Sequence, residues 1–178
     1  TTNRLGDIVN SNPLYVGAPA PNMPGEGYND FAAAKKNRKP AIYVGANDGM
    51  LHAFDASKPG TTGATPGQEL FAYIPSAVFS RLSQLTSPGY SHKYYVDGSP
   101  TVSEACLGTC GSSSDWRTVL VGGLNAGGQG VYALNVTDPA QFSTANPTDI
   151  VMWEFTDRDD PDLGYTFSKP VIRLMNNG

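Results

Sequence analysis

Three acidic residues near the C-terminal end of the chain are the first candidates for metal binding. Asp157, Asp159 and Asp162 fall within the run "DRDDPDLG", and calcium prefers oxygen ligands of this kind. The run departs from an EF-hand loop, however, because Asp162 stands where the loop needs glycine and Ser168 where it needs glutamate. The sequence therefore favours a solvated acidic turn, and it leaves the three aspartates as candidate metal ligands.

The two cysteines, Cys106 and Cys110, are four residues apart. A disulfide at this separation closes a tight loop, and disulfides persist in oxidising compartments. The alternative is a metal site, which needs further cysteine or histidine ligands that the neighbouring sequence lacks. We therefore predict a disulfide between Cys106 and Cys110.

The two histidines, His52 and His92, are the remaining candidates for acid-base or metal chemistry. His52 lies inside an apolar strand, at a position that Tyr132 occupies in a similar later stretch, so we interpret it as a packing residue. His92 lies in the aromatic run "GYSHKYY", where a contact with a partner protein is an alternative to a structural role. The sequence contains neither a nucleophilic serine elbow nor a phosphate-binding loop with its lysine, and it predicts no catalytic or cofactor-binding residues.

The composition excludes several classes of protein. The 178 residues include 39% apolar and 16% charged side chains, which is typical of a globular chain with a core. The net charge of -4 gives no basic surface for nucleic acid, and no apolar run is long enough to span a membrane. Twenty glycines, fourteen prolines and nine tyrosines favour an all-β chain with many turns.

An internal repeat indicates the elements that must position these residues. Residues 43–55 begin with "YVG" and end with "LHAFD", and residues 120–135 begin with "LVG" and end with "VYALN". A strand that starts after a proline precedes each copy, and an aromatic-rich strand, "ELFAYI" or "VMWEF", follows it. Each unit is therefore predicted to hold four antiparallel strands, as a blade of a β-propeller does.

The first copy contains a predicted hairpin with a two-residue turn at Asp48 and Gly49. A type I′ turn needs positive φ at both central residues, and aspartate and glycine tolerate that conformation. This turn would place Val44 opposite Ala53 across the hairpin.

Residues 1–178 are predicted to be part of a single β-propeller domain. The first blade is expected over residues 10–75, the second over residues 98–157, and the first strand of a third over residues 168–178. An insertion over residues 76–97 separates the two blades. Two blades cannot close a ring, since propellers have about four to eight. We expect a β-propeller fragment that self-associates through an open blade face.

The insertion between the blades contains one predicted short helix. Its sequence, "SAVFSRLSQLT", begins with Ser76 as a candidate N-cap. Four apolar residues would share one face of the helix, namely Val78, Phe79, Leu82 and Leu85. Insertions of this kind project from a rigid scaffold and are where partners usually bind.

Six ordered stretches resemble the propeller domain of the PilC/PilY-type adhesins of type IV pilus tips. They are "RLGDIVNSNPLYVG", "YVGANDGMLHAFDA", "ELFAYIPSAVF", "YYVDGSPTVSEA", "VGGLNAGGQGVYALNVTDP" and "WEFTDRDDPDLGYTFSKP". Together they cover nearly the whole chain apart from the insertions and the cysteine loop. The resemblance implies the N-terminal part of the propeller of a larger exported protein. That protein would lie at the cell surface, outer membrane or pilus tip of a Gram-negative bacterium.

The resemblance also implies a function, a non-enzymatic scaffold for pilus assembly, twitching motility and surface attachment. The implied partners are minor pilins and host or abiotic surfaces. The family's calcium loop has no match within residues 1–178, so calcium is expected in the parent protein and no cofactor in this segment. Two alternatives stay open. One is a quinone-dependent dehydrogenase. Its propeller blades contain sequences similar to "YVGANDGMLHAFDA", and its chemistry needs a cofactor site. The other is a scaffold for outer-membrane protein assembly.

Overall fold

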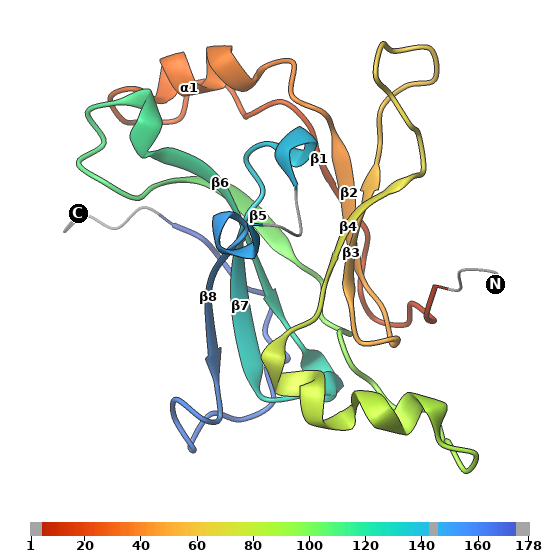
Figure 1. Cartoon of the computed structure of the whole chain (residues 1–178). Helices are drawn as coiled ribbons and strands as arrows, with labels where there is room; N and C mark the ends of the chain where they lie inside the picture. Colours follow the sequence, from red (N-terminus) through yellow and green to blue (C-terminus); the bar gives the residue numbers. More distant parts are fainter. Residues whose placement is uncertain (1–4, 143–145, 174–178) are drawn as a thin grey trace.

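Two antiparallel sheets of four strands form the framework of the chain in a computed structural model that describes residues 5–142 and 146–173 (Figure 1). The first sheet holds β1 (Leu14–Val16), β2 (Ala41–Gly45), β3 (Leu51–Asp55) and β4 (Glu69–Tyr73). The second holds β5 (Thr101–Cys106), β6 (Trp116–Gly123), β7 (Gly130–Asn135) and β8 (Val151–Thr156). In both sheets each strand pairs with the next one along the chain, which confirms the two predicted four-stranded units.

The two sheets repeat each other strand for strand, and each has an irregularity in register after an alanine, Ala53 in β3 and Ala133 in β7. The pairing corrects the predicted alignment of the two copies by one residue. Ala53 pairs with Tyr43 and Ala133 pairs with Val121, so Tyr43 corresponds to Val121 and not to Leu120. Apolar residues occupy both faces of these strands, so alternation of residue types does not fix the alignment.

The turn between β2 and β3 differs from the predicted two-residue turn. Its closing hydrogen bond runs from the N–H of Ala46 to the carbonyl of Met50 over 2.9 Å, so the turn holds three residues. The last of them, Gly49, has a φ of 98°. Val44 consequently pairs with His52, one residue away from its predicted partner. In this turn only the glycine needs a positive φ, so Asp48 avoids the left-handed conformation that a type I′ turn would require of it.

The predicted short helix between the sheets is present as the 3-10 helix η1 (Ser76–Thr86). Pro75, and not Ser76, occupies the N-cap position, and no side chain caps the helix. Val78 is buried, whereas Phe79 is 56% exposed, in contrast to the single apolar face that the sequence predicts. A 3-10 helix has about three residues per turn, so it does not present the face of an α-helix.

The sequence predicts no helix between β1 and β2, where the structure has α1 (Tyr28–Lys35). Gly27 stands at its N-cap with a φ of 71° and offers no side-chain cap, so the usual signal for a helix start is missing. The buried side chains of α1, Tyr28 and Phe31, pack on Trp116 at the start of β6, and the rings of Tyr28 and Trp116 lie 4.8 Å apart. The helix α1 thus packs on the second sheet, although in the chain it lies between two strands of the first sheet.

Four single turns of 3-10 helix lie in the remaining connections. They are η2 (Ser113–Asp115), η3 (Asn125–Gly127), η4 (Pro139–Gln141) and η5 (Pro147–Asp149). Among the helices of the described residues, none has the length and apolar character needed to cross a bilayer.

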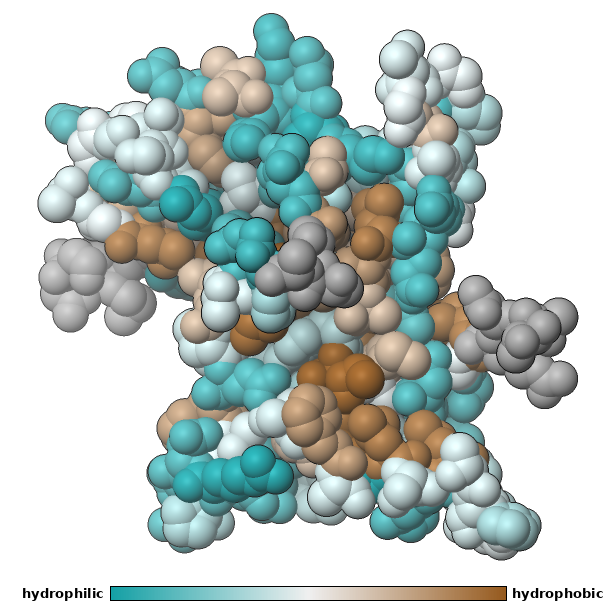
Figure 2. Space-filling model, viewed as in Figure 1, coloured by the Kyte–Doolittle hydropathy of each residue, from teal (hydrophilic) through white to brown (hydrophobic). Residues whose placement is uncertain are grey.

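One hydrophobic core joins the two sheets. Figure 2 shows apolar side chains gathered where the sheets meet and below that junction, toward η1. Seven large side chains of this core are fully buried, namely Tyr43, Leu51, Tyr95, Leu120, Leu124, Tyr132 and Leu134. Both sheets contribute to one interior, so neither buries its apolar face without the other.

The predicted first strand of a third unit falls on residues 168–178. Residues 168–173 form no strand, and residues 174–178 lie outside the described part of the chain. A strand needs a neighbour with which to exchange hydrogen bonds, and in the described sheets each strand order ends at β4 or β8.

Candidate functional site

Arg38, in the connection after α1, makes a buried ionic link to the second sheet. Its side chain is 2% exposed and donates hydrogen bonds to the carbonyl of Gly17 at 2.6 Å, the hydroxyl of Thr118 and the carbonyl of Thr137 at 3.3 Å. The carboxylate of Glu104 in β5 lies 3.6 Å from the guanidinium. Burial lowers the pKa of Arg38 and the charge of Glu104 opposes that change. The guanidinium stays charged because an arginine begins far above neutrality.

Glu154 makes a second link between the sheets, from β8 to the end of β4. Its carboxylate accepts hydrogen bonds from the hydroxyls of Tyr73 and Ser76, and from the N–H of Ser76 at 3.1 and 3.2 Å. Burial and the hydrogen bond to Glu154 both raise the pKa of Tyr73, so Tyr73 is a neutral donor at physiological pH. A sequence signal for this role exists, because Glu154 is a lone charge in the strand "VMWEFT".

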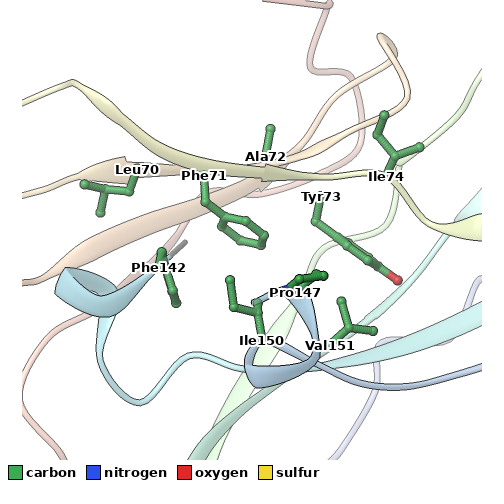
Figure 3. A pocket seen from close by; sticks show the side chains of 9 residues that line it. All are labelled: Leu70, Phe71, Ala72, Tyr73, Ile74, Phe142, Pro147, Ile150 and Val151. Atoms are coloured by element: carbon green, nitrogen blue, oxygen red, sulfur yellow. The ribbon is translucent and has the colours of Figure 1, made fainter. Parts of the chain in front are cut away.

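An apolar cavity of about 600 Å³ lies between β4 and the connection that leads from β7 into β8 (Figure 3). We call it the outer groove. Its walls are formed by Leu70, Phe71, Ala72, Tyr73, Ile74, Phe142, Pro147, Ile150 and Val151. The rings of Phe71 and Phe142 approach to 5.0 Å across it. Its volume falls within the range of cavities that hold ligands.

His52 packs against Phe54, as the sequence predicts, but its ring also lies between two carboxylates. Its Nδ1 atom lies 2.5 Å from Oε1 of Glu69, and its Nε2 atom lies 3.1 Å from Oδ2 of Asp48. Both partners are carboxylates, which accept hydrogen bonds, so the protonated imidazole, with an N–H on each ring nitrogen, is the form that satisfies both of them. Burial opposes the charged ring, but the hydrogen bonds and charges of Asp48 and Glu69 outweigh burial and raise the pKa of His52.

Asp48 also holds the N-terminal segment of the described chain. One of its carboxylate oxygens accepts the N–H of Gly6 at 2.8 Å, and the other accepts the N–H of Met50 at 3.1 Å. Against the cost of burial, hydrogen bonds from His52 and Gly6 lower the pKa of Asp48. The turn between β2 and β3 therefore rests on a charged network that includes His52.

The three candidate metal ligands near the C-terminal end do not converge. The carboxylate of Asp159 accepts the N–H and hydroxyl of Thr156, at 2.8 and 3.1 Å. The N–H of Asp162 is bound by the carboxylate of Asp160 at 2.9 Å. Over residues 5–142 and 146–173, no group of three or more acidic, histidine or cysteine side chains is placed to hold a metal ion. Asp157, Asp159 and Asp162 belong to a turn that follows β8.

Cys106 and Cys110 form a disulfide, with their Cα atoms 5.7 Å apart. The bridge closes the loop after β5, in which Cys110 takes a positive φ of 62°. Cys106 also packs against the cluster of Tyr28, Phe31 and Trp116. The cysteine loop therefore supports the place where α1 contacts the second sheet.

His92 and His52 hold different carboxylates and form no common site. Nε2 of His92 lies 2.7 Å from Oδ2 of Asp7, and both side chains are largely exposed. The amide of Asn47 donates to the same carboxylate oxygen at 3.2 Å. Against a small cost of burial, these hydrogen bonds lower the pKa of Asp7.

The sequence did not reveal Arg38 or the outer groove. Arg38 lies in the run "KKNRK", which has the pattern of a solvated surface segment. Its burial depends on residues of the second sheet, so no local pattern marks it. The groove-lining strand "ELFAYI" is predicted, but the cavity exists only because Phe142 and Ile150, in the connection between β7 and β8, face that strand.

Comparison with known proteins places this fold in a family. The family model of the PilY1 beta-propeller domain matches residues 5–178. The type IV pilus biogenesis factor PilY1 of Pseudomonas aeruginosa is 46% identical over 98% of this chain and 14% of that protein. A PilY1 homolog of Xylella fastidiosa, also named a type IV pilus biogenesis factor, is 44% identical over 98% of this chain and 13% of its own length.

A solved structure supports the same relationship. The crystal structure of the Pseudomonas aeruginosa PilY1 C-terminal domain matches this structure with a TM-score of 0.65 and 41% sequence identity, over 92% of this chain and 29% of that chain. The chain thus spans about one seventh of the length of the relatives named above. These matches confirm the β-propeller fragment and the resemblance found in the sequence. The chain belongs to the PilY1 β-propeller domain family.

Proposed function

We propose that this chain is a non-enzymatic propeller scaffold in type IV pilus biogenesis. The observation that carries the proposal is the pair of links, one buried at Arg38 and one partly buried at Glu154, that join the two sheets. A body joined in this way gives rigid support to the segments that project from it, α1 at one end and η1 at the other (Figure 1). Relatives named type IV pilus biogenesis factors support the same function.

Within this function, the scaffold supports pilus assembly, twitching motility and surface attachment. Its partners in the proposal are minor pilins and host or abiotic surfaces, contacted through inserted segments such as η1, where Phe79 is exposed. The proposed location is the cell surface, outer membrane or pilus tip of a Gram-negative bacterium. The disulfide between Cys106 and Cys110 supports export, because disulfides persist in oxidising compartments.

We further propose that this segment works without a cofactor of its own and that calcium, where the parent protein needs it, binds in another part of that protein. The turn after β8 supports this division. Its Asp159 carboxylate is engaged by Thr156, so a calcium ion would compete with two hydrogen bonds there. Isothermal titration of the chain with calcium should show no binding at residues 157–162.

Gene deletion and complementation test the pilus role. Deleting the gene of the parent protein should remove surface pili, twitching motility and attachment, and the wild-type gene should restore all three. A gene that encodes Glu154→Ala should restore them less well, because the substitution loosens the joint between the sheets. Unchanged piliation, motility and attachment in the deletion strain would contradict the proposal.

A dehydrogenase assay of the purified parent protein tests the non-enzymatic part of the proposal. The expected result is no quinone absorption band and no turnover with a redox dye. Clear turnover would overturn the non-enzymatic assignment. Turnover would not bear on the pilus role, which the deletion strain tests separately.

A further inference from the structure

We infer that the outer groove receives an extended segment of another protein chain, which adds a strand beside β4. The inference goes beyond the pilus role and does not depend on it. β4 ends the strand order β1-β2-β3-β4, so only one of its edges is paired within its sheet. The other edge presents backbone N–H and C=O groups, which are a template for an added strand.

The groove reaches the backbone of β4 and not only one of its faces. Five successive residues line it, from Leu70 to Ile74. Successive side chains in a strand point to opposite faces, and Figure 3 shows Phe71 and Tyr73 pointing into the gap while Ala72 and Ile74 point away. The residues that point away also line the cavity, so it follows the strand itself and not only the side chains of one face. An occupant therefore meets apolar side chains and backbone hydrogen-bonding groups together.

This combination selects an extended peptide over a small apolar molecule. The opposite wall is apolar, with Phe142, Pro147 and Ile150 among its members. An apolar molecule would cover the edge of β4 without satisfying its backbone groups, and burying such groups unpaired costs free energy. An extended chain pairs them and turns every second side chain toward the apolar wall. A partner strand of about five residues matches the length of β4.

Charges beside the groove specify the partner further. None of the nine lining residues is charged. In each wall, however, one lining residue follows directly after an acidic residue. Glu69, which precedes Leu70, is 47% exposed and shares its carboxylate with the ring of His52, whereas Asp149, which precedes Ile150, is exposed. Opposite charges across an interface favour the encounter. We therefore expect apolar residues at alternate positions of the partner segment and a lysine or arginine at one end.

A selection experiment on the complete parent protein tests this inference. The probe is a phage library of random heptapeptides, and the counter-selection uses Phe142→Arg, which places a cation in the groove wall. The matched control is Phe79→Arg, the same change on η1. Pro147→Arg, in the exposed turn η5, is a second groove variant in case Phe142→Arg unfolds. The expected peptides show alternating apolar residues with a basic end, bind wild type and Phe79→Arg, and fail to bind the groove variants.

Backbone methylation of an enriched peptide separates strand addition from side-chain docking. N-methyl groups at one set of alternate residues remove the donors that face β4, and affinity should fall about tenfold or more; at the other set, affinity should change little. Equal effects of both sets would overturn the inference. So would a library without enriched peptides, or peptides that bind the groove variants as well as wild type. Peptides that match this chain's own sequence would make the occupant a second copy and overturn the inference as stated.

Discussion

The hydroxyl of Tyr73 in β4 donates a hydrogen bond to the carboxylate of Glu154 in β8, across the boundary between the two sheets. The two residues are 81 positions apart in the chain. Because Ser76 at the start of η1 binds the same carboxylate, one side chain joins both outer strands and the helix between them. The joint is therefore sensitive to a change at a single position.

Glu154→Ala should lower the free energy of unfolding by about 2 kcal/mol, because Tyr73 and Ser76 lose their acceptor inside the protein. Glu154→Gln should cost less, since its amide oxygen still accepts. Urea denaturation measures both values, with Glu26→Ala at an exposed glutamate as control. Equal losses for the Ala and Gln variants would show that the hydrogen bonds are not the cause.

Arg38→Met should lower the free energy of unfolding by about 3 kcal/mol, because Glu104, 11% exposed, is left as a buried charge without its partner. Adding Glu104→Gln to this variant should recover part of the loss. A double-mutant cycle in urea measures the coupling between the two side chains. Purely additive losses would rule out an ionic link between them.

The charged network around His52 should make stability depend on pH. The pKa of His52 is raised above its ordinary 6.5. Its contribution to the free energy of unfolding is therefore complete below pH 6.5 and is lost as the pH rises through the folded-state pKa. The pKa of Asp48 is lowered from 3.8. Its contribution to the free energy of unfolding is therefore present above pH 3.8 and is lost as the pH falls through the folded-state pKa. The urea midpoint should therefore fall as the pH rises above about 6.5.

His52→Gln should lower stability at about pH 6 and remove most of this alkaline loss. The matched control is His92→Gln, since His92 is exposed, and it should retain the alkaline loss. If both variants keep the wild-type dependence on pH, another group is responsible for it.

Replacing both cysteines with serine should lower the free energy of unfolding by about 2 kcal/mol, the entropy expected for closing a loop of this size. Hydrogen exchange should increase in residues 107–115 before it increases in β6 or β7. Mass spectrometry under non-reducing conditions should find the wild-type chain lighter by two hydrogens. Exchange that rises evenly over the chain would show that the bridge acts on the whole fold.

The chain should self-associate through β8. Trp153 and Phe155 lie on the same face of that strand and are both exposed. Sedimentation velocity should give a mass that rises with concentration. Phe155→Lys should weaken the association, while Phe79→Lys, at an equally apolar residue on η1, should not. A strictly monomeric wild-type chain at high concentration would contradict this prediction.

Strand order was predictable from the sequence because it depends on local patterns, such as the proline before β5 and the aromatic residues of β8. Register was not, because Asp48 and Gly49 are compatible with turns of two and three residues, and only the backbone bonds of Ala46 decide between them. The candidate site was predictable only in part. His52 was identified, but its raised pKa depends on Asp48 and on Glu69, which the fold brings to it from another strand.

The contact of α1 with Trp116 has a consequence for the order of assembly. In a chain made from its N-terminus, α1 emerges long before β6, so the rings of Tyr28 and Phe31 lack their partner Trp116 when they first appear. During synthesis there is therefore a stage at which α1 has been made but Trp116, the residue of the second sheet on which it packs, has not. Any export machinery or chaperone that handles the growing chain meets these two aromatic rings uncovered.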